Sequence, residues 1–457
     1  MHHHEAETRR LMEQVFALAA ERLALDPPPL DRPRPRAELA AAVGTTITAA
    51  GLGADRALGL FTDVLAPACL SMDHPRYLSF VPNAPTEAAT LFDLVVGACN
   101  IYGGSWLEGA GAVHAENEAL RWIADLAGFP PGAGGTFVSG GSLANLSALA
   151  AARHRWRSTA EAEEGESPVV ILSRAAHSSI AAALELLDLH PMVVDTDDVG
   201  RLCPRALPAA TLDRLRGVAP RVAAIVGTAG LTNSGGIDDL AAIADLAADL
   251  GAWFHVDAAY GGGALCTPRR RPLFDGVERA DSLTVDPHKW LFAPYDCAAI
   301  VYRDPAEARA TFTQRAEYLD AVNDTDDWNP SDYAPHLSRR ARGLPFWFSV
   351  AAHGTDAYRD AVDAALDVTE EAATLIRGSG HLELLVEPEL SVLLFRRTGW
   401  AAADYWEWSR RLLEDQVGFV VPSTWRGETV LRLCIVNPRT TMDDIRAVLP
   451  PVTPAGP

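Results

Sequence analysis

Short apolar runs alternate with amphipathic segments through the middle of the chain. Six runs of four or five residues have the composition of β-strands: 136–139, 169–172, 192–195, 223–227, 253–257 and 282–285. Segments with helical spacing of apolar positions, such as 142–157 and 238–250, lie between several of them. This alternation predicts a mostly parallel sheet with helices on both faces, whose ligands lie beyond the carboxyl ends of the strands.

The pattern changes on both sides of this region. Residues up to about 75 are rich in Ala, Leu and Arg and predict helices, broken by the Pro-rich stretch 26–36, which we expect to be an extended strap. The apolar run 297–303 follows the sixth strand after a short turn and is predicted to be an antiparallel edge strand. Residues 313–343 are polar, lack periodicity and form a longer connection than compact domains normally use.

The C-terminal part predicts a separate α+β unit. A long amphipathic helix near 353–378 and a helix near 403–416 accompany apolar strands at 391–397 and 429–436. We therefore divide the chain into four parts, which are an N-terminal helical segment, a large domain, a mobile loop with its connection, and a small domain: 1–75, 76–312, 313–345 and 346–457.

Composition narrows the possible partners. A net charge of −21 makes nucleic acid and anionic membrane surfaces poor partners, and no apolar run is long enough to span a bilayer. The six cysteines are scattered without a C-x-x-C pair, which favours reduced thiols over a disulfide framework or a zinc site: Cys69, Cys99, Cys203, Cys266, Cys297 and Cys434. We expect a cytoplasmic protein whose site holds no metal.

Lys289 is the only lysine among 39 Lys and Arg residues. Arginine would serve for a surface charge or a phosphate contact, but it does not lose its proton near neutral pH and attack a carbonyl. Chance retention in an Arg-rich chain is the alternative explanation. A lysine that forms an imine is the hypothesis that accounts for its identity.

Four other features follow predicted strands. Gly140, Gly141 and Ser142 begin a helix, as in a phosphate cradle, although Gly-Ser also serves as an ordinary cap. Asp257, in "HVDAAYGGG", suits a charge-assisted bond to a heterocyclic nitrogen or a simple turn. His177 in "RAAHSSI" and Thr232 in "TAGLTNSGGID" are each explained equally well by structural roles.

Taken together, these features favour a binding site over separate structural roles. A phosphate cradle, a carboxylate for a ring nitrogen and an amine for an aldehyde are the three groups that bind pyridoxal 5'-phosphate (PLP). His288 precedes the lysine, so it is placed to contact the cofactor or carry a proton, unless it is only a turn residue.

The chain resembles the group II PLP-dependent amino acid decarboxylases, of the aromatic-L-amino-acid and glutamate decarboxylase type. The resemblance runs from "HPRYLSFVPN" at 74 to "LRLCIVNPRTT" at 431, and its most specific marks are "HVDAAYGG" and "DPHKW". It implies the aspartate-aminotransferase-like fold type I, with a small α+β C-terminal domain. It also implies a homodimer with active sites at the interface, acting on a small amino acid substrate.

The resemblance also implies residue roles. Lys289 would form the imine with the cofactor, Asp257 would pair with the pyridine nitrogen and His177 would stack on the ring. The remaining cofactor contacts would be Gly141, Ser142, Thr232, Ala259 and His288. A mobile loop would present Tyr333, in "NPSDYAPHL", as the acid that protonates the substrate carbon, although an ordinary loop tyrosine is the alternative.

Substrate residues are also expected by position. Met72, Phe80, Val81 and Pro82, with Asn83 after them, stand where the family has an aromatic stretch, while Tyr102 and Gly104 fall where a partner subunit would line the pocket. Met72 and Gly104 replace bulkier aromatic residues of animal enzymes. An aromatic or bulky apolar amino acid is therefore the expected substrate, and Arg76 keeps an acidic one open.

Other functions remain as alternatives. A decarboxylation-dependent aldehyde synthase is disfavoured because Tyr333 is not phenylalanine, and an aminotransferase usually needs a dedicated arginine for the α-carboxylate. A non-enzymatic binding protein is disfavoured by the complete set of cofactor-binding groups.

Overall fold

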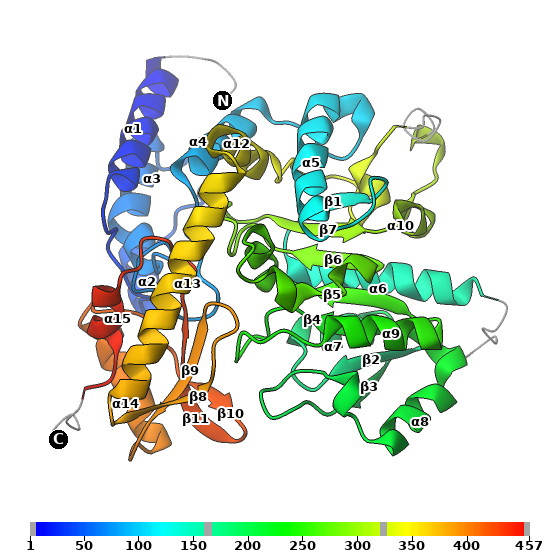
Figure 1. The fold of residues 1–457 in the computed structure, drawn as a ribbon. Coiled ribbons are helices and arrows are strands. Elements are labelled where there is room, and N and C mark those ends of the chain that lie inside the picture. The colour runs from blue at the N-terminus through cyan, green and yellow to red at the C-terminus, as the bar shows by residue number, and fades with distance from the viewer. Residues whose placement is uncertain (1–5, 160–166, 320–326, 452–457) are drawn as a thin grey trace.

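A seven-stranded sheet forms the centre of the large domain (Figure 1). The structure is a computed structural model that describes residues 6–159, 167–319 and 327–451. The strand order is β1-β7-β6-β5-β4-β2-β3. The strands are β1 Gly134–Val138, β2 Val169–Ser173, β3 His190–Val194, β4 Val222–Thr228, β5 Trp253–Asp257, β6 Ser282–Val285 and β7 Ala298–Tyr302. All six strands predicted from the apolar runs are confirmed.

The sheet is parallel except for β7. This strand pairs antiparallel with both β1 and β6, so the prediction of an antiparallel strand is confirmed but its placement at the edge is wrong. Every residue of β7 is buried, and an all-apolar run such as Ala298–Tyr302 suits an interior position. The edges are β1 and β3.

Helices cover both faces of the sheet, as predicted. Alternate residues of each strand point to opposite faces, so Val170 packs with α6 Gly141–Arg157 and α7 Ser178–Leu186, while Ile171 packs in the cluster that contains α5 Trp106–Leu126 and α9 Leu240–Leu250. Helices α8 Ala209–Gly217 and α10 Pro305–Phe312 complete the large domain. The helix-strand alternation places the carboxyl ends of the parallel strands along one side of the sheet.

The N-terminal segment is helical, with α1 Ala6–Leu23, α2 Arg36–Val43 and α3 Ala54–Leu60, the last continuing into a π-helical turn at Phe61–Leu65. The Pro-rich strap between α1 and α2 carries no helix or strand. Figure 1 shows α1 at the outer edge of the molecule. Helix α4 Glu87–Cys99 then leads into the large domain.

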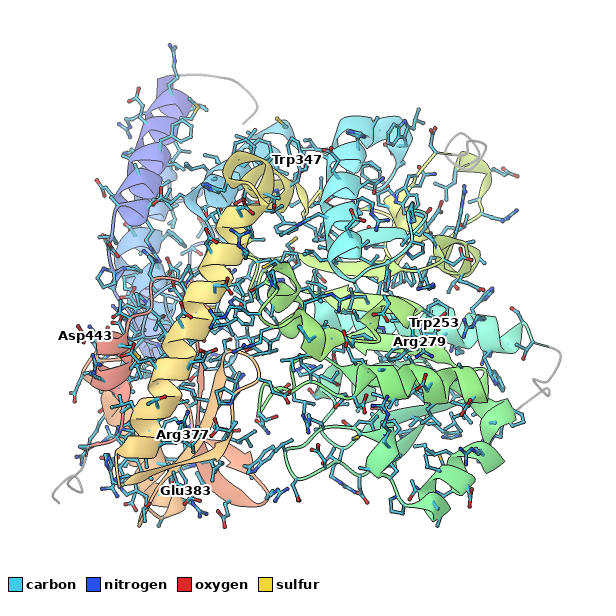
Figure 2. All side chains as sticks on the ribbon, in the orientation of Figure 1. Trp253, Arg279, Trp347, Arg377, Glu383 and Asp443 are labelled. Carbon is cyan, nitrogen blue, oxygen red and sulfur yellow. The ribbon has the colours of Figure 1, made fainter. Side chains whose placement is uncertain are left out.

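The C-terminal unit contains a four-stranded antiparallel sheet in the order β10-β11-β9-β8. Its strands and helices are α12 Leu344–His353, α13 Thr355–Gly378, β8 Leu382–Val386, β9 Val392–Arg397, α14 Ala402–Glu414, β10 Ser423–Trp425, β11 Glu428–Cys434 and α15 Met442–Val448. Figure 2 shows side chains filling the space between α13 and the two sheets, with Arg377 near one end of α13. The four-part division of the chain stays a prediction.

The polar connection 313–345 is only partly regular. It contains short 3₁₀ turns at Glu317–Leu319 and Pro330–Asp332, and residues 320–326 lie outside the described part. Buried Arg339 anchors its end through two bonds to the Glu116 carboxylate, 2.6 and 2.9 Å, and through the carbonyl oxygens of Gly103 and Phe137. In the described ranges, no helix is long and apolar enough to cross a membrane.

Candidate active site

A cavity of about 470 Å³ opens where β1, β2, β4, β5 and β6 end. It gathers eleven of the residues predicted from sequence: Met72, Phe80, Val81, Gly141, Ser142, His177, Thr232, Asp257, Ala259, His288 and Lys289. Pro82, Tyr102 and Tyr333 do not line it. The structure thus brings together most of the predicted site from segments more than 200 residues apart.

The turn between β1 and α6 begins a helix at the cavity and has no side-chain cap. Gly140 is the N-cap of α6 and, having no side chain, gives no side-chain hydrogen bond to the first turn. A Cβ at Gly140 would meet nothing within 4 Å, whereas one at Gly141 would lie 2.9 Å from the Asp286 carboxylate and 3.1 Å from Ala259 Cβ. The glycines therefore let the start of a 17-residue helix face the cavity directly.

Asp257 is held by directed hydrogen bonds. Its Oδ2 accepts from Asn145 Nδ2 at 2.8 Å and its Oδ1 accepts from the Ala259 N–H at 3.1 Å, so it fills its turn role while facing the cavity. Because the Asn145 amide donates to Asp257, its Oδ1 is the acceptor for His255 Nε2 at 2.9 Å. Burial lowers the pKa of His255 to about 4, despite the opposing charge of Asp257, so this imidazole is neutral.

The same network determines which nitrogen of His177 carries the proton. Asn145 Nδ2 also donates to Ser179 Oγ at 3.1 Å, which leaves the Ser179 hydroxyl proton for His177 Nδ1 at 2.8 Å. The Ser179 N–H donates to the same Nδ1 at 3.2 Å, so His177 also caps α7. Because Nδ1 accepts, Nε2 is the ring nitrogen that carries a proton.

Lys289 forms an ion pair inside the cavity. Its Nζ lies 2.9 Å from Asp286 Oδ2, which also accepts from the Gly141 N–H at 3.3 Å. Burial lowers the pKa of Lys289, but the charge of Asp286 and its hydrogen bond, with the charge of Asp257, outweigh burial and raise it. The only lysine is thus held as an ammonium.

His288 and Tyr295 form a further wall. His288 Nδ1 accepts from the Cys297 N–H at 3.1 Å, and burial lowers the pKa of His288 although Asp286 opposes the shift. The Tyr295 ring lies 4.9 Å from the His288 ring and is 49% exposed. His288 is therefore a neutral imidazole with an Nε2–H.

Met72, Phe80 and Val81 form an apolar wall. Phe80 is 61% exposed and has a φ of 54°, a left-handed backbone conformation that is unusual for a phenylalanine. Arg432 holds this turn, because it donates to the carbonyl oxygens of Phe80 at 2.5 Å and Thr232 at 2.6 Å. An aromatic side chain is thereby presented at the cavity rather than packed into the core.

Pro82, Tyr102 and Arg76 lie outside the cavity. Pro82 is buried beside Val81, and Tyr102 donates to the Leu337 carbonyl at 2.8 Å. Arg76 is engaged by Asp444 at 2.9 Å and by the Val417 carbonyl at 3.2 Å. The only signal for an acidic substrate in the sequence is therefore directed elsewhere.

Tyr333 is packed into the large domain. It is 3% exposed, its ring stacks on Trp328 with centroids 4.2 Å apart, and its carbonyl accepts from the Tyr302 hydroxyl at 3.0 Å. Burial raises the pKa of its phenol. Its assignment as the acid stays a prediction, because this packing keeps the hydroxyl out of the chain's own cavity.

Several cavity residues were not predicted from sequence, among them Asn145, Ser179, Tyr260, Asp286 and Tyr295. Asn145 lies one helical turn after Gly141, and that spacing would have identified it. Asp286 stands three residues before the lysine, where a loop position gave no indication of its direction. No sequence signal marks Tyr295.

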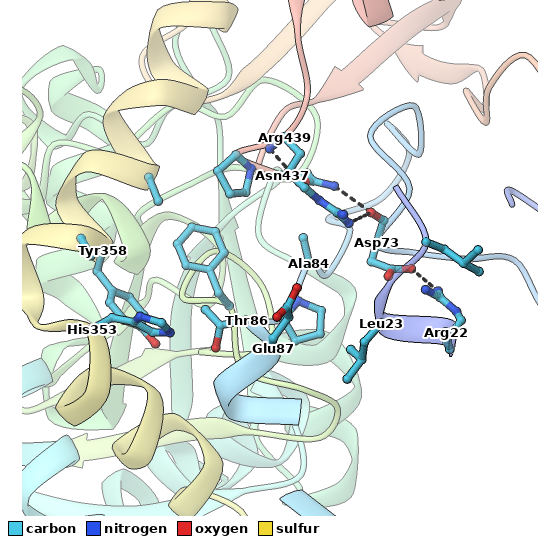
Figure 3. Close-up of a pocket in the computed structure, with 16 residues that line it drawn as sticks. Arg22, Leu23, Asp73, Ala84, Thr86, Glu87, His353, Tyr358, Asn437 and Arg439 are labelled. Atoms are coloured by element: carbon cyan, nitrogen blue, oxygen red, sulfur yellow. Dashed lines mark hydrogen bonds and ion pairs between the residues drawn. The ribbon is translucent and has the colours of Figure 1, made fainter. Parts of the chain in front are cut away.

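A second cavity, of about 350 Å³, lies between the end of α1, the start of α4 and α13 (Figure 3). Asp73 is its polar centre: its carboxylate pairs with Arg22 at 2.8 Å, and its carbonyl accepts from Asn437 and Arg439, each at 2.9 Å. Phe292 and Tyr358 form an apolar part. Its two arginines are therefore already engaged within the protein.

Comparison with known proteins identifies the family. The pyridoxal-dependent decarboxylase conserved domain matches residues 49–398. The chain belongs to this family. It is therefore a PLP-dependent decarboxylase, and the cofactor predicted from the strand-end residues is confirmed.

Two curated relatives align with most of this chain. An aromatic-L-amino-acid decarboxylase of Bacillus atrophaeus is 33% identical over 391 residues, 83% of this chain and 80% of the relative. An L-2,4-diaminobutyrate decarboxylase of Rhizobium meliloti is 33% identical over 387 residues, 82% and 77% of the two chains. The solved TDC of Oryza sativa with PLP and tryptamine has a TM-score of 0.90 at 24% identity, over 98% of this chain and 97% of that one. The predicted fold type I is confirmed.

The cavity fits PLP. A side chain on Gly141 would collide with Asp286 and Ala259, so glycine is needed where the start of α6 would meet the phosphate. Asp257 offers a buried carboxylate for the ring nitrogen, and Lys289 an amine for the aldehyde. Ala259 and His177 both line the cavity, and their contacts with the cofactor ring stay predictions.

Proposed function

We propose that this decarboxylase converts an aromatic or bulky apolar L-amino acid to the corresponding amine and CO₂. The observation that supports this substrate class is the composition of the cavity wall. Met72, Phe80, Val81 and the Tyr295 ring face it, and its described lining contains no arginine. An acidic side chain would therefore be buried without a counter-charge, at a cost of several kcal/mol.

A cationic side chain is also poorly matched. Two carboxylates line the cavity, but Asp257 is bound by Asn145 and the Ala259 N–H, and Asp286 is paired with Lys289. The charge of Asp286 is already offset by Lys289, and that of Asp257 would be offset by the ring nitrogen of the cofactor, so a second ammonium would meet no unbalanced charge, although Asp286 Oδ1 has no hydrogen-bond partner among the described residues. The lining of the cavity therefore favours the activity named for the Bacillus relative over that named for the Rhizobium relative.

The bound cofactor supplies an electron sink for bond cleavage at the substrate's Cα. Asp257, held in place by Asn145 and the Ala259 N–H, would pair with the ring nitrogen. The N–H groups at Gly141 and Ser142 would bind the phosphate, with Thr232 beside them, and the Gly141 N–H would exchange its 3.3 Å bond to Asp286 for that contact. His177 and His288 would each offer an Nε2–H group as a hydrogen-bond donor in the cavity. Lys289 would provide the covalent attachment to the cofactor.

Tyr333 remains our proposed proton donor. To act, its hydroxyl must reach a cavity after leaving the Trp328 stack, or must reach the cavity of a second subunit. Two hydrogen bonds support the route to a second subunit. The Ser331 N–H donates to the Gly104 carbonyl at 3.1 Å, and the Tyr102 hydroxyl donates to the Leu337 carbonyl, so the two segments expected at a subunit interface pack together.

We also infer a homodimer with shared active sites. Apolar residues are exposed on α4, at the start of α5 and in the π-helical turn after α3: Leu91, Leu94, Val95, Leu107 and Phe61. Exposed apolar patches of this kind are typical of interfaces. Exposed Phe80 would be covered by the partner. We infer a cytoplasmic location from the six free cysteines.

A substrate panel tests the proposal. Amine and CO₂ are measured with tyrosine, tryptophan, dopa, phenylalanine, valine, leucine, glutamate, aspartate and 2,4-diaminobutyrate. The aromatic and bulky apolar amino acids should have the highest kcat/KM. A highest value for glutamate, aspartate or diaminobutyrate would overturn the substrate class.

A further inference from the structure

Asp286 is a buried carboxylate with an unusual set of partners. It is 2% exposed, and its Oδ2 lies 2.9 Å from Lys289 Nζ and 3.3 Å from the Gly141 nitrogen. Its Oδ1 is buried and, among the described residues, has no hydrogen-bond partner. An ionised carboxylate in such a place is costly unless it is paired. The Lys289 ammonium is the charge that offsets this cost.

We propose that Asp286 is a positioning residue that keeps Lys289 as an ammonium, directed to the cavity floor, whenever the lysine is not covalently attached to the cofactor. The inference rests on the proposed function, in which Lys289 is the attachment residue. It adds a role for a neighbouring acid that neither the family match nor the sequence motifs assign.

The charges around Lys289 come from several elements. Asp286 and His288 belong to its own loop, Asp257 ends β5, and Cys434 ends β11, while His177 and Tyr295 line the same cavity. His288 is neutral, since burial lowers its pKa, and burial raises the pKa of the Cys434 thiol. Asp286 is the carboxylate in direct contact with Nζ, so it has the largest effect in favour of the ammonium.

This arrangement has a consequence for the order of events. An ammonium has no lone pair and cannot attack a carbonyl, so a lysine displaced by the substrate amine would be retained by Asp286 rather than compete with the substrate. When Lys289 is attached again, Nζ must pass its proton to an acceptor, and Asp286 Oδ2, 2.9 Å away, is the carboxylate in contact with it. Asp286 therefore regulates when the amine is available, without itself touching substrate.

The single lysine permits a direct experiment. Full-length protein freed of cofactor is acetylated over the neutral to alkaline pH range, and peptide mass spectrometry measures modification of Lys289, with the α-amine as internal reference. The expected result is that Asp286→Asn moves the pH midpoint of Lys289 acetylation downward by about one unit or more. That shift means about tenfold faster labelling at a fixed pH below the midpoint.

Two matched variants sharpen the result. Asp286→Glu keeps a carboxylate and should restore the midpoint toward that of the wild type. Asp296→Asn makes the same substitution in the same loop, but Asp296 pairs with Arg342 at 3.0 Å, so no shift is expected. Equal midpoints in the wild type and Asp286→Asn would overturn the proposal, as would an equal shift in Asp296→Asn.

A second measurement does not depend on any variant. Protein labelled with ¹³C at lysine Cε gives one lysine resonance, whose titration reports Lys289 alone. A midpoint at or above the usual lysine value of about 10.4 is expected. A lower midpoint would overturn the proposal. Because neither experiment uses cofactor or substrate, their failure is distinguishable from failure of the decarboxylase assignment, which product assays decide.

Discussion

The cavity at Lys289 and the cavity at Phe292 are built from neighbouring residues of the same three segments, yet they differ in chemistry. Met72, Val81 and Lys289 line the first, whereas Asp73, Ala84 and Phe292 line the second. Their volumes, about 470 and 350 Å³, are similar. Volume and position therefore do not explain which of them is catalytic.

The polar groups make the difference. In the second cavity Asp73 is bound by Arg22, Asn437 and Arg439, so the charges and donors of these four residues are used within the fold (Figure 3). In the first cavity, hydrogen bonds hold the Asp257 and His177 side chains in place while both still face the cavity. Asp286 Oδ1 has no hydrogen-bond partner in the described chain. Polar groups that are fixed but available distinguish a site from a packing gap.

The largest effect should come from Lys289→Arg. The positive charge stays, but an amine able to form an imine is lost, so cofactor-linked absorbance and turnover should both fall below detection. Spectra and amine production measure the two. Normal turnover in this variant would show that the first cavity is not catalytic.

Tyr333→Phe should reduce amine formation by about 10²–10⁴-fold, the usual contribution of a positioned general acid. The ring and its stacking on Trp328 are kept, so cofactor spectra and KM should change little. Because protonation is slowed, aldehyde, ammonia and peroxide should replace part of the amine, and oxygen uptake measures this.

The matched control for Tyr333 is Tyr358→Phe in the second cavity. The Tyr358 hydroxyl donates to Ser349 Oγ at 2.6 Å and has no catalytic role here. If Tyr333→Phe makes amine at the wild-type rate, the acid is another group, and His288 or a bound water becomes the candidate.

Asp257→Asn should lower kcat by about 10²–10³-fold, the range for loss of one electrostatic stabiliser. Some cofactor should remain bound, because the phosphate and lysine contacts persist. Steady-state kinetics with excess PLP measures the change. A near wild-type rate would mean that the Asn145–Asp257 bond is only structural.

Phe80→Ala should lower kcat/KM for aromatic substrates by about 10–200-fold, as expected for a lost apolar contact. Valine and leucine should be affected less, so comparing substrates within one variant separates a pocket effect from general damage. An equal loss for all substrates would place Phe80 outside the substrate pocket.

The smallest effect belongs to Asp73→Asn, which breaks a partly exposed ion pair in the second cavity. Such pairs contribute about 0–1 kcal/mol to stability, and kcat/KM should stay within about twofold of the wild type. A large loss of activity, with the melting temperature unchanged, would show that the two cavities are functionally coupled.

Local patterns predicted the strands and most of the cavity because those features depend on nearby residues. Apolar runs located β1 to β6, and strand-end positions brought Asp257, His177 and Lys289 together. The interior place of β7 depends on pairing with β1, about 160 residues away, which no local pattern contains. Likewise, the packing of Tyr333 against Trp328 and the direction of Asp286 depend on tertiary contacts.

The most direct test of the central claim is to locate the cofactor covalently. The protein is incubated with PLP and reduced with borohydride, which converts a lysine–aldehyde linkage to a stable secondary amine, and the peptides are analysed by mass spectrometry. The account predicts about one pyridoxyl group per chain, on the peptide that contains Lys289, with loss of decarboxylation. Absence of this adduct, or reduction at the α-amine with Lys289 unmodified, would contradict it.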